Sequence, residues 1–272
     1  MIAENLYGYG IGSFVGASFL QSLHLILRAI HVCLGFVGLA LFWLIIAVPK
    51  GGMWHVRFGK VFAIVTWIIG GSALISSVWA LVHLDSFAPH IQHAPDSEWQ
   101  REIYQFIFAI LLYLSAATIS GAVFGIQVVR KRDRHDELRQ TSLPIWLTIT
   151  MCCAMGLCTF GLWRLCTQQT ATTGMPRAAF LIPALVGLFG IVTAWRELRY
   201  VYGPFPGHRA RLDRHIWHMC GTGVAFHTAF IVFGANRLFG FQLPGAWQLI
   251  PWIAPPVIGM ALTAQYLRRL NP

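Results

Sequence analysis

The fold class that this sequence predicts is a multi-pass helical membrane protein, and three observations point to it. Hydrophobic residues make up 56% of the 272-residue chain and charged residues only 11%, with a mean hydropathy of +0.61. A soluble domain carries roughly a quarter charged residues. Several apolar stretches exceed the ~18 residues that indicate a membrane-spanning helix. The sequence also lacks the alternating ~10-residue segments typical of a membrane β-barrel.

These apolar stretches predict seven spans in a single membrane domain covering residues 1–272. Residues 1–21, rich in glycine and aromatic side chains, predict an interfacial helix or an outward extension of the first span. Prolines within the fifth and seventh spans predict kinks. The predicted spans are residues 23–48, 60–83, 103–129, 144–166, 179–196, 216–239 and 248–267.

The basic residues are divided unequally between the two sides of this layout. Fifteen of the 20 lysines and arginines fall on the side that holds the C-terminus, which identifies that side as cytoplasmic. The N-terminus is therefore expected outside, and the chain in a bacterial inner (cytoplasmic) membrane. The net charge of +10 reflects topology rather than nucleic-acid binding. Anionic lipid at the cytoplasmic face is the expected partner.

The ten acidic residues are all assigned to loops in this layout. Glu102 falls just before the third predicted span, and Glu197 falls just after the fifth. With no carboxylate inside a span, carboxylate proton relays and carboxylate-bridged metal pairs are not expected in the membrane. Histidine, arginine and sulfur therefore remain for intramembrane chemistry.

An outer cluster of basic side chains is expected on the first span. His24, Arg28 and His31 recur at i, i+4 and i+7, so they share one helix face. His83 arrives on the same side at the outer end of the second span. Imidazoles can serve as axial ligands of a b-type haem, and Arg28 can neutralise a propionate. The alternative is a wet rim of interfacial side chains.

Metal binding is a separate expectation on the same side of the membrane. His83, His90 and His93 could capture copper or zinc in the periplasm, because imidazole suits both metals. The fourth span also carries two methionines and three cysteines between residues 151 and 158. Soft sulfur ligands suit Cu(I), so copper passage is a further alternative. The competing interpretation is that these small cysteines only pack between helices.

An inner rim is expected where the first inner loop and the sixth span begin. It contains His55, Arg57, His215 and His218, and the last two share a helix face because they are three residues apart. If the loop approaches the sixth span, the rim could hold an anionic ligand or a quinone headgroup. The alternative is a basic rim that faces lipid headgroups.

His227 lies deeper in the sixth span, about 18 Å from His215 at 1.5 Å per residue. Its depth resembles that of His31, so the two imidazoles could face each other as cofactor ligands. The preferred interpretation of His227 is a buried, hydrogen-bonded core histidine.

One short motif supports a resemblance. The chain reads Lys50-Gly51-Gly52-x-x-His55-x-Arg57-x-Gly59, preceded by His31-x-x-x-Gly35. Here it resembles a family of predicted bacterial membrane proteins of unassigned function, although Val56 replaces the arginine that commonly follows the motif histidine. The likeness recurs at His215, at Thr228-Ala229-Phe230 and at Asn236. The resemblance implies that His31, His55, His215 and Asn236 are candidate functional positions, and it implies no activity.

Histidines on apolar helices also make the chain similar to cytochrome b561-type haem membrane proteins. The leading functional hypothesis is therefore a redox role, in which helix-borne histidines, His31 first, handle a b-type haem or a quinone and exchange electrons with a membrane redox partner. The competing hypothesis is a non-enzymatic carrier or sensor, whose histidines and Arg28 line a ligand cavity or respond to pH. Periplasmic copper or zinc binding is the third.

Overall fold

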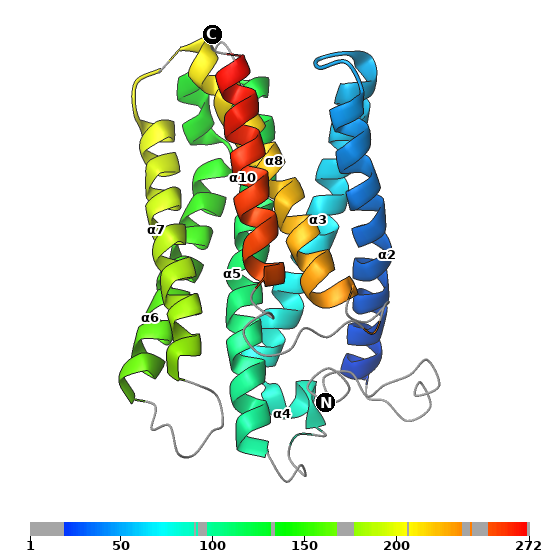
Figure 1. The fold of residues 1–272 in the computed structure, drawn as a ribbon, viewed down its shortest axis with the longest axis vertical. Helices are drawn as coiled ribbons and strands as arrows, with labels where there is room; N and C mark the ends of the chain where they lie inside the picture. The colour runs from blue at the N-terminus through cyan, green and yellow to red at the C-terminus, as the bar shows by residue number, and fades with distance from the viewer. Residues whose placement is uncertain are drawn as a thin grey trace. The chain divides into compact units, whose positions relative to one another are not determined.

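The computed structural model describes residues 19–89, 91, 97–131, 134–167, 177–205, 207–235, 240 and 250–270. Throughout these ranges every regular element is a helix or helical turn, which confirms the predicted all-helical class (Figure 1). In chain order they are α2 (Phe19–Ala47), α3 (Met53–Val82), α4 (Leu84–Phe87), α5 (Ser97–Arg130), η3 (His135–Gln140), α6 (Leu143–Thr167), η4 (Arg177–Phe180), α7 (Leu181–Tyr202), α8 (His208–Ala229), the π-helical turn η5 (Phe230–Ala235) and α10 (Ile250–Arg269).

Six helices in the described part of the chain are long and apolar enough to cross a membrane. They are α2, α3, α5, α6, α7 and α8. The chain is therefore a multi-pass membrane protein. The seventh predicted span is helical too, as α10, but it is not one of these six. Pro255 and Pro256 lie inside α10 and, with Gln265, reduce its apolar character.

Several helices extend beyond the predicted spans, and this corrects the assignment of every acidic residue to a loop. α5 begins at Ser97 rather than at residue 103, and α7 continues to Tyr202 rather than ending at residue 196. Glu102 and Glu197 consequently lie inside helices and are buried. Hydropathy marks only the ~20 residues that fit the hydrocarbon layer, whereas the backbone hydrogen bonds of a helix continue past it.

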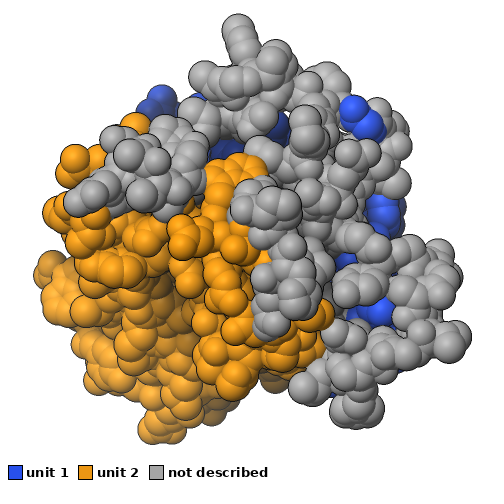
Figure 2. All heavy atoms as spheres, turned by 90° about the horizontal axis from the view of Figure 1, so that it is seen from below, with its two compact units in different colours: residues 1–65, 220–272 blue, residues 66–219 orange. Residues whose placement is uncertain are grey.

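The chain divides into two compact units, which Figure 2 colours separately. Unit 1 comprises Met1–Val65 and Cys220–Pro272, and unit 2 comprises Thr66–Met219. The boundary falls within α3 and within α8, so each of these helices contributes to both units.

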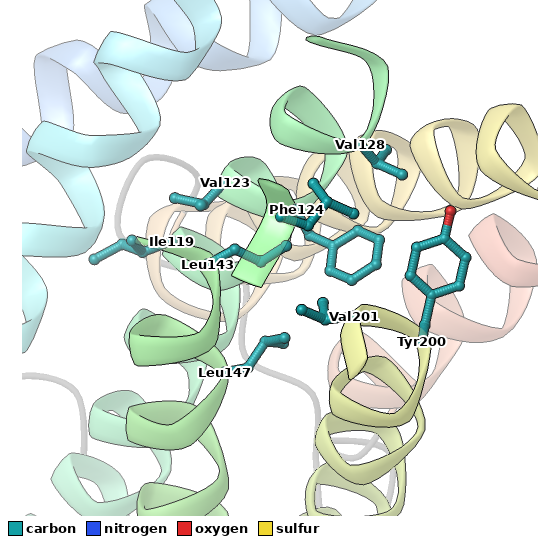
Figure 3. Packing of buried hydrophobic residues seen from close by; sticks show 9 residues of the cluster. Ile119, Val123, Phe124, Val128, Leu143, Leu147, Tyr200 and Val201 are labelled. Carbon is teal, nitrogen blue, oxygen red and sulfur yellow. The ribbon is translucent and has the colours of Figure 1, made fainter. Parts of the chain in front are cut away.

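In unit 2, α6 and α7 approach to backbone contact. A Cβ atom added to Gly187 would lie 2.5 Å from the backbone nitrogen of Cys158, and one added to Gly161 would meet the backbone of Ala184. Small residues permit such an approach between membrane helices. A buried cluster then joins this pair to α5 and η3 (Figure 3): Ile119, Val123, Phe124, Val128, Leu138, Leu143, Leu147, Tyr200 and Val201.

In unit 1, an aromatic core joins α2, the start of α3 and the second half of α8. The ring of Phe42 fills the space beside Gly223, which has no room for a Cβ atom. Phe62 contacts both Phe42 and Phe226, with ring centroids 6.4 Å and 5.4 Å apart. These ring contacts add van der Waals packing between the helices of this unit.

Candidate functional site

Glu197 is the centre of the most polar buried site in unit 2. It lies on α7 and is only 7% exposed. Its carboxylate faces the first half of α8, where Arg214 and His218 are four residues apart and so lie on one helix face. Arg214 forms an ion pair with Oε1 of Glu197. His218 places its Nε2 3.5 Å from Oε2 of the same carboxylate.

Aromatic rings surround these three side chains. Phe124 of α5 stacks on the His218 imidazole, with ring centroids 4.2 Å apart and an interplanar angle of 25°. The guanidinium carbon of Arg214 lies 5.1 Å from the centroid of the Tyr200 ring. Rings of this kind exclude water and attract cations through their faces. We call Glu197, Tyr200, Arg214 and His218 the Glu197 cluster.

The Tyr200 hydroxyl forms no hydrogen bond with the other members of the Glu197 cluster. It is buried and has no hydrogen-bond partner among the described residues. Figure 3 shows the hydroxyl pointing away from the hydrophobic cluster, while the Tyr200 ring lies beside that of Phe124. A buried hydroxyl without a partner costs about 1–3 kcal/mol, so a ligand that accepted its hydrogen bond would bind more tightly.

His215 holds α8 against α5 beside this cluster. Its Nδ1–H donates to the backbone carbonyl of Gly125 at 2.6 Å, because a carbonyl can only accept. The absence of a side chain at Gly125 also admits Met219, whose sulfur would lie 2.7 Å from an added Cβ atom. His215 and His218 were predicted to share a helix face. Their partners differ: His215 bonds to the Gly125 carbonyl, and His218 lies beside the Glu197 carboxylate.

The Glu197 cluster is a buried ion pair with a histidine beside the second carboxylate oxygen. A buried carboxylate is retained only when a cation or several donors compensate its desolvation. Here Arg214 and His218 approach the same carboxylate from α8, and the Arg214 ion pair supplies that compensation. The sequence signal was present but weak: Glu197 and Tyr200 are three apart, and Arg214 and His218 are four apart, at helical spacing.

A second buried ion pair lies in the same unit. Glu102 of α5, 3% exposed, pairs with Arg164 of α6. The Arg164 guanidinium also lies over two rings, 5.3 Å from the centroid of Phe180 and 5.6 Å from that of Trp163. The loop assignment of Glu102 from sequence concealed this pair as well.

His227 in unit 1 is half-buried and forms hydrogen bonds with α2 and with its own helix. The indole Nε1–H of Trp43 donates to Nε2 of His227 at 3.1 Å. Nδ1–H of His227 donates to the Gly223 carbonyl, one helical turn earlier, at 2.7 Å. Both ring nitrogens are thus engaged by protein groups.

The structure gives Lys50 and His55 of the sequence motif a local role at the end of α2. Lys50 Nζ donates to the carbonyls of Ile45 at 3.0 Å and of Val48 at 3.4 Å. His55 Nδ1–H donates to the same Ile45 carbonyl at 3.4 Å. A cation at a helix C-terminus is favourable. Partial burial lowers the pKa of Lys50 from its ordinary value.

Two features of the motif shape the turn itself. Gly51 has a φ of +76°, a backbone conformation that glycine adopts without strain. Arg57 lies over the Trp54 ring, 5.4 Å from its centroid.

The predicted outer cluster is described only in part. Arg28 and His31 are half-buried on α2, and His83 is exposed between α3 and α4. The His24 side chain, His90, His93 and Asn236 lie outside the described residues. Within the ranges that the structure describes, no three His, Cys, Asp or Glu side chains group as a metal site would require. His55 belongs to unit 1 and His215 and His218 to unit 2, so the inner rim is described as two separate sites.

No protein-family model, curated protein or solved structure matches this chain.

Proposed function

We propose that the protein is a proton-linked membrane carrier of a small anion, with the Glu197 cluster as its exchange site. The observation that supports this proposal is the buried ion pair between Glu197 and Arg214, with His218 against the second carboxylate oxygen. Ionisable side chains inside a membrane commonly mark substrate and proton pathways, because they are too costly to keep otherwise.

The chemistry of the pair links the proton to the anion. While Glu197 is ionised, it occupies the Arg214 guanidinium. A proton on Glu197 removes that negative charge and leaves Arg214 as a buried cation without compensation, which is strongly unfavourable. A carboxylate ligand restores the balance, since guanidinium binds carboxylates through two parallel hydrogen bonds. A proton and an anion therefore bind together and cross the membrane without net charge.

The proposed topology places this site near the cytoplasmic side of a bacterial inner membrane. α10 acts as a seventh span, the N-terminus lies outside and the C-terminus inside, in keeping with the surplus of lysine and arginine near the C-terminal side. The Glu197 cluster lies near the end of α7 and the start of α8. Anionic lipid headgroups surround that end of the helices.

Thermal unfolding in detergent tests the proposal with acetate, succinate and inorganic phosphate as probes. Because proton and anion bind together, a bound carboxylate should raise the unfolding temperature more at acidic than at neutral pH. Arg214→Gln should abolish this stabilisation. Arg209→Gln is the matched control, since Arg209 pairs with Asp213 on the same helix at 3.3 Å. Equal stabilisation of wild type and Arg214→Gln by every probe would reject the assignment.

A quinone is the second candidate ligand, favoured by the buried Tyr200 hydroxyl. A quinone carbonyl could accept a hydrogen bond from that hydroxyl, and Glu197 and His218 lie in the same cluster as Tyr200. This retains the redox hypothesis at a different place from His31. Organic extraction of the purified protein and its Tyr200→Phe variant would test it. A visible spectrum of the same preparations tests for b-type haem, with His31→Ala as the diagnostic variant.

A further inference from the structure

The two buried ion pairs of unit 2 lie at opposite ends of the same group of helices. Glu102 is near the start of α5 and Arg164 is near the end of α6, whereas Glu197 is near the end of α7. On α5, Gly125 marks the Glu197 end, because it accepts the hydrogen bond of His215. Glu102 and Gly125 are separated by about 35 Å of helix at 1.5 Å per residue. That length is close to the ~30 Å thickness of a hydrocarbon layer.

The same helices are joined into two pairs. α6 and α7 meet at backbone distance through Gly161 and Gly187, so they are expected to move together. At the Glu197 end, α5 and α8 are joined by the His215–Gly125 hydrogen bond and by Met219 against Gly125. Each ion pair connects one helix pair to the other: Glu102 of α5 to Arg164 of α6, and Glu197 of α7 to Arg214 of α8.

One tight contact between α5 and α7 lies midway between the two ion pairs. A Cβ atom added to Gly190 of α7 would lie 2.6 Å from the Tyr113 ring of α5. Tyr113 is almost halfway along α5 between Glu102 and Gly125. A close contact in the middle, with an ion pair at each end, is compatible with a rocking motion of one helix pair against the other.

We propose that Glu102 and Arg164 form a second anion-exchange site, which opens when the Glu197 site is closed. The inference rests on the proposed carrier function. Arg164 takes the anion in exchange for Glu102, as Arg214 does for Glu197. Its buried Nε has no hydrogen-bond partner in the described part of the chain. The α6–α7 pair rocks about the Tyr113–Gly190 contact, so separation at one end tightens the other.

Other charged groups near the second site are compatible with this role. Arg177 of η4 donates to the carbonyl of Leu165, next to Arg164. Arg101, beside Glu102 in sequence, forms its own exposed ion pair with Asp85. The positive surroundings favour an anion and disfavour a metal cation.

Thiol labelling from each side of the membrane tests the reciprocity without a ligand. In a chain whose six cysteines are replaced by alanine or serine, F106C reports the Glu102 end and V128C reports the Glu197 end, since both parent residues are buried. Glu102→Gln should raise labelling of the F106C thiol by an impermeant maleimide several-fold and lower that of the V128C thiol. Glu197→Gln should do the reverse. Arg209→Gln, which breaks the ion pair between Arg209 and Asp213 within α8, is the control and should change neither.

The outcomes separate the second site from the proposed function. Increased labelling at both positions in either variant would show that the ion pairs only stabilise the helix packing, and would overturn the proposal. Unchanged labelling in both variants would overturn it as well. The exchanged pair Glu102→Arg with Arg164→Glu should restore the labelling of the parent, which excludes misfolding as the cause. If labelling is reciprocal but the anion-binding test fails, the rocking motion is supported and anion binding at the two sites is rejected.

Discussion

The indole nitrogen of Trp43 donates a hydrogen bond to Nε2 of His227 at 3.1 Å. Because Nδ1 of the same imidazole is held by the Gly223 carbonyl, the ring is locked in one tautomer. This pair therefore stabilises the contact between α2 and α8 in unit 1, in addition to the packing of Phe42 against Gly223.

Trp43→Phe should weaken unit 1 while keeping an aromatic ring beside Phe42 and His227. The variant keeps an aromatic ring at position 43 but lacks the indole N–H that donates to Nε2 of His227. Polar contacts between membrane helices contribute about 0.6 kcal/mol on average, and an unsatisfied acceptor adds to this loss. Unfolding by denaturing detergent measures the change, with Trp195→Phe, an exposed tryptophan on α7, as the control. A loss no larger than that of the control would contradict the role assigned to this bond.

The end of α7 is capped by side chains of η3. Arg139 donates from Nε to the Val201 carbonyl at 3.3 Å and from a terminal nitrogen to the Tyr202 carbonyl at 3.2 Å. His135 donates to the Tyr200 carbonyl at 3.1 Å. Arg139→Gln should remove this cap and cost about 0.3–1 kcal/mol, as expected for a cation at a helix C-terminus.

Amide hydrogen exchange over residues 196–205 measures the loss of the Arg139 cap. Exchange should accelerate there in Arg139→Gln and remain unchanged in α6. Arg134→Gln is the matched control, because Arg134 is on the same segment but pairs with Glu137. Equal exchange in the two variants would show that Arg139 contributes nothing to the helix end.

The long apolar stretches of the sequence were sufficient to predict a helical membrane protein, but not its buried polar site. Glu197 and Glu102 lie just outside the apolar windows, where hydropathy cannot distinguish a loop from the last turns of a helix. Their partners, Arg214 and Arg164, come from other helices, and sequence spacing carries no information on contacts between helices. The hydrogen bond of His227 likewise could not be predicted, because its partner Trp43 comes from another helix.

The KGGxxHxRxG motif shows the same division between local and long-range information. Its role at the end of α2 depends on groups within ten residues: Lys50 and His55 meet the Ile45 carbonyl. Such a role is readable from the Gly51 turn and a nearby cation. The predicted meeting of His55 with His215 required a contact between distant helices, and these residues belong to different units.

Glu137 should make the stability of the η3 turn depend on pH. The hydrogen bond from Lys131, together with the charge of Arg134, lowers the pKa of Glu137 from its ordinary value of 4.5. Because the pKa is lower in the folded state than in the unfolded state, the ionised form stabilises folding above pH 4.5, and this contribution is lost as the pH falls through the folded-state pKa.

A comparison of wild type with Glu137→Gln isolates that contribution. The two proteins should differ in unfolding midpoint near neutral pH and converge in acid, below the ordinary pKa of the carboxyl group. Asp136→Asn is the control, since Asp136 is largely exposed and pairs only with Arg139 at 3.3 Å. A difference that grew as the pH fell would have the wrong sign and contradict the assignment.

Removing Arg214 alone should be more damaging than removing both members of its ion pair. Arg214→Gln leaves the Glu197 carboxylate buried without this ion pair, and loss of one partner from a buried pair costs about 3–5 kcal/mol. The double variant Glu197→Gln with Arg214→Gln replaces the charges with two amides that can bond to each other, so most of that loss should be recovered. Unfolding free energies of the single and double variants give the coupling between the two sites. If the two losses simply added, Glu197 and Arg214 would be independent, and the exchange of a ligand for Glu197 at Arg214 would have no energetic basis.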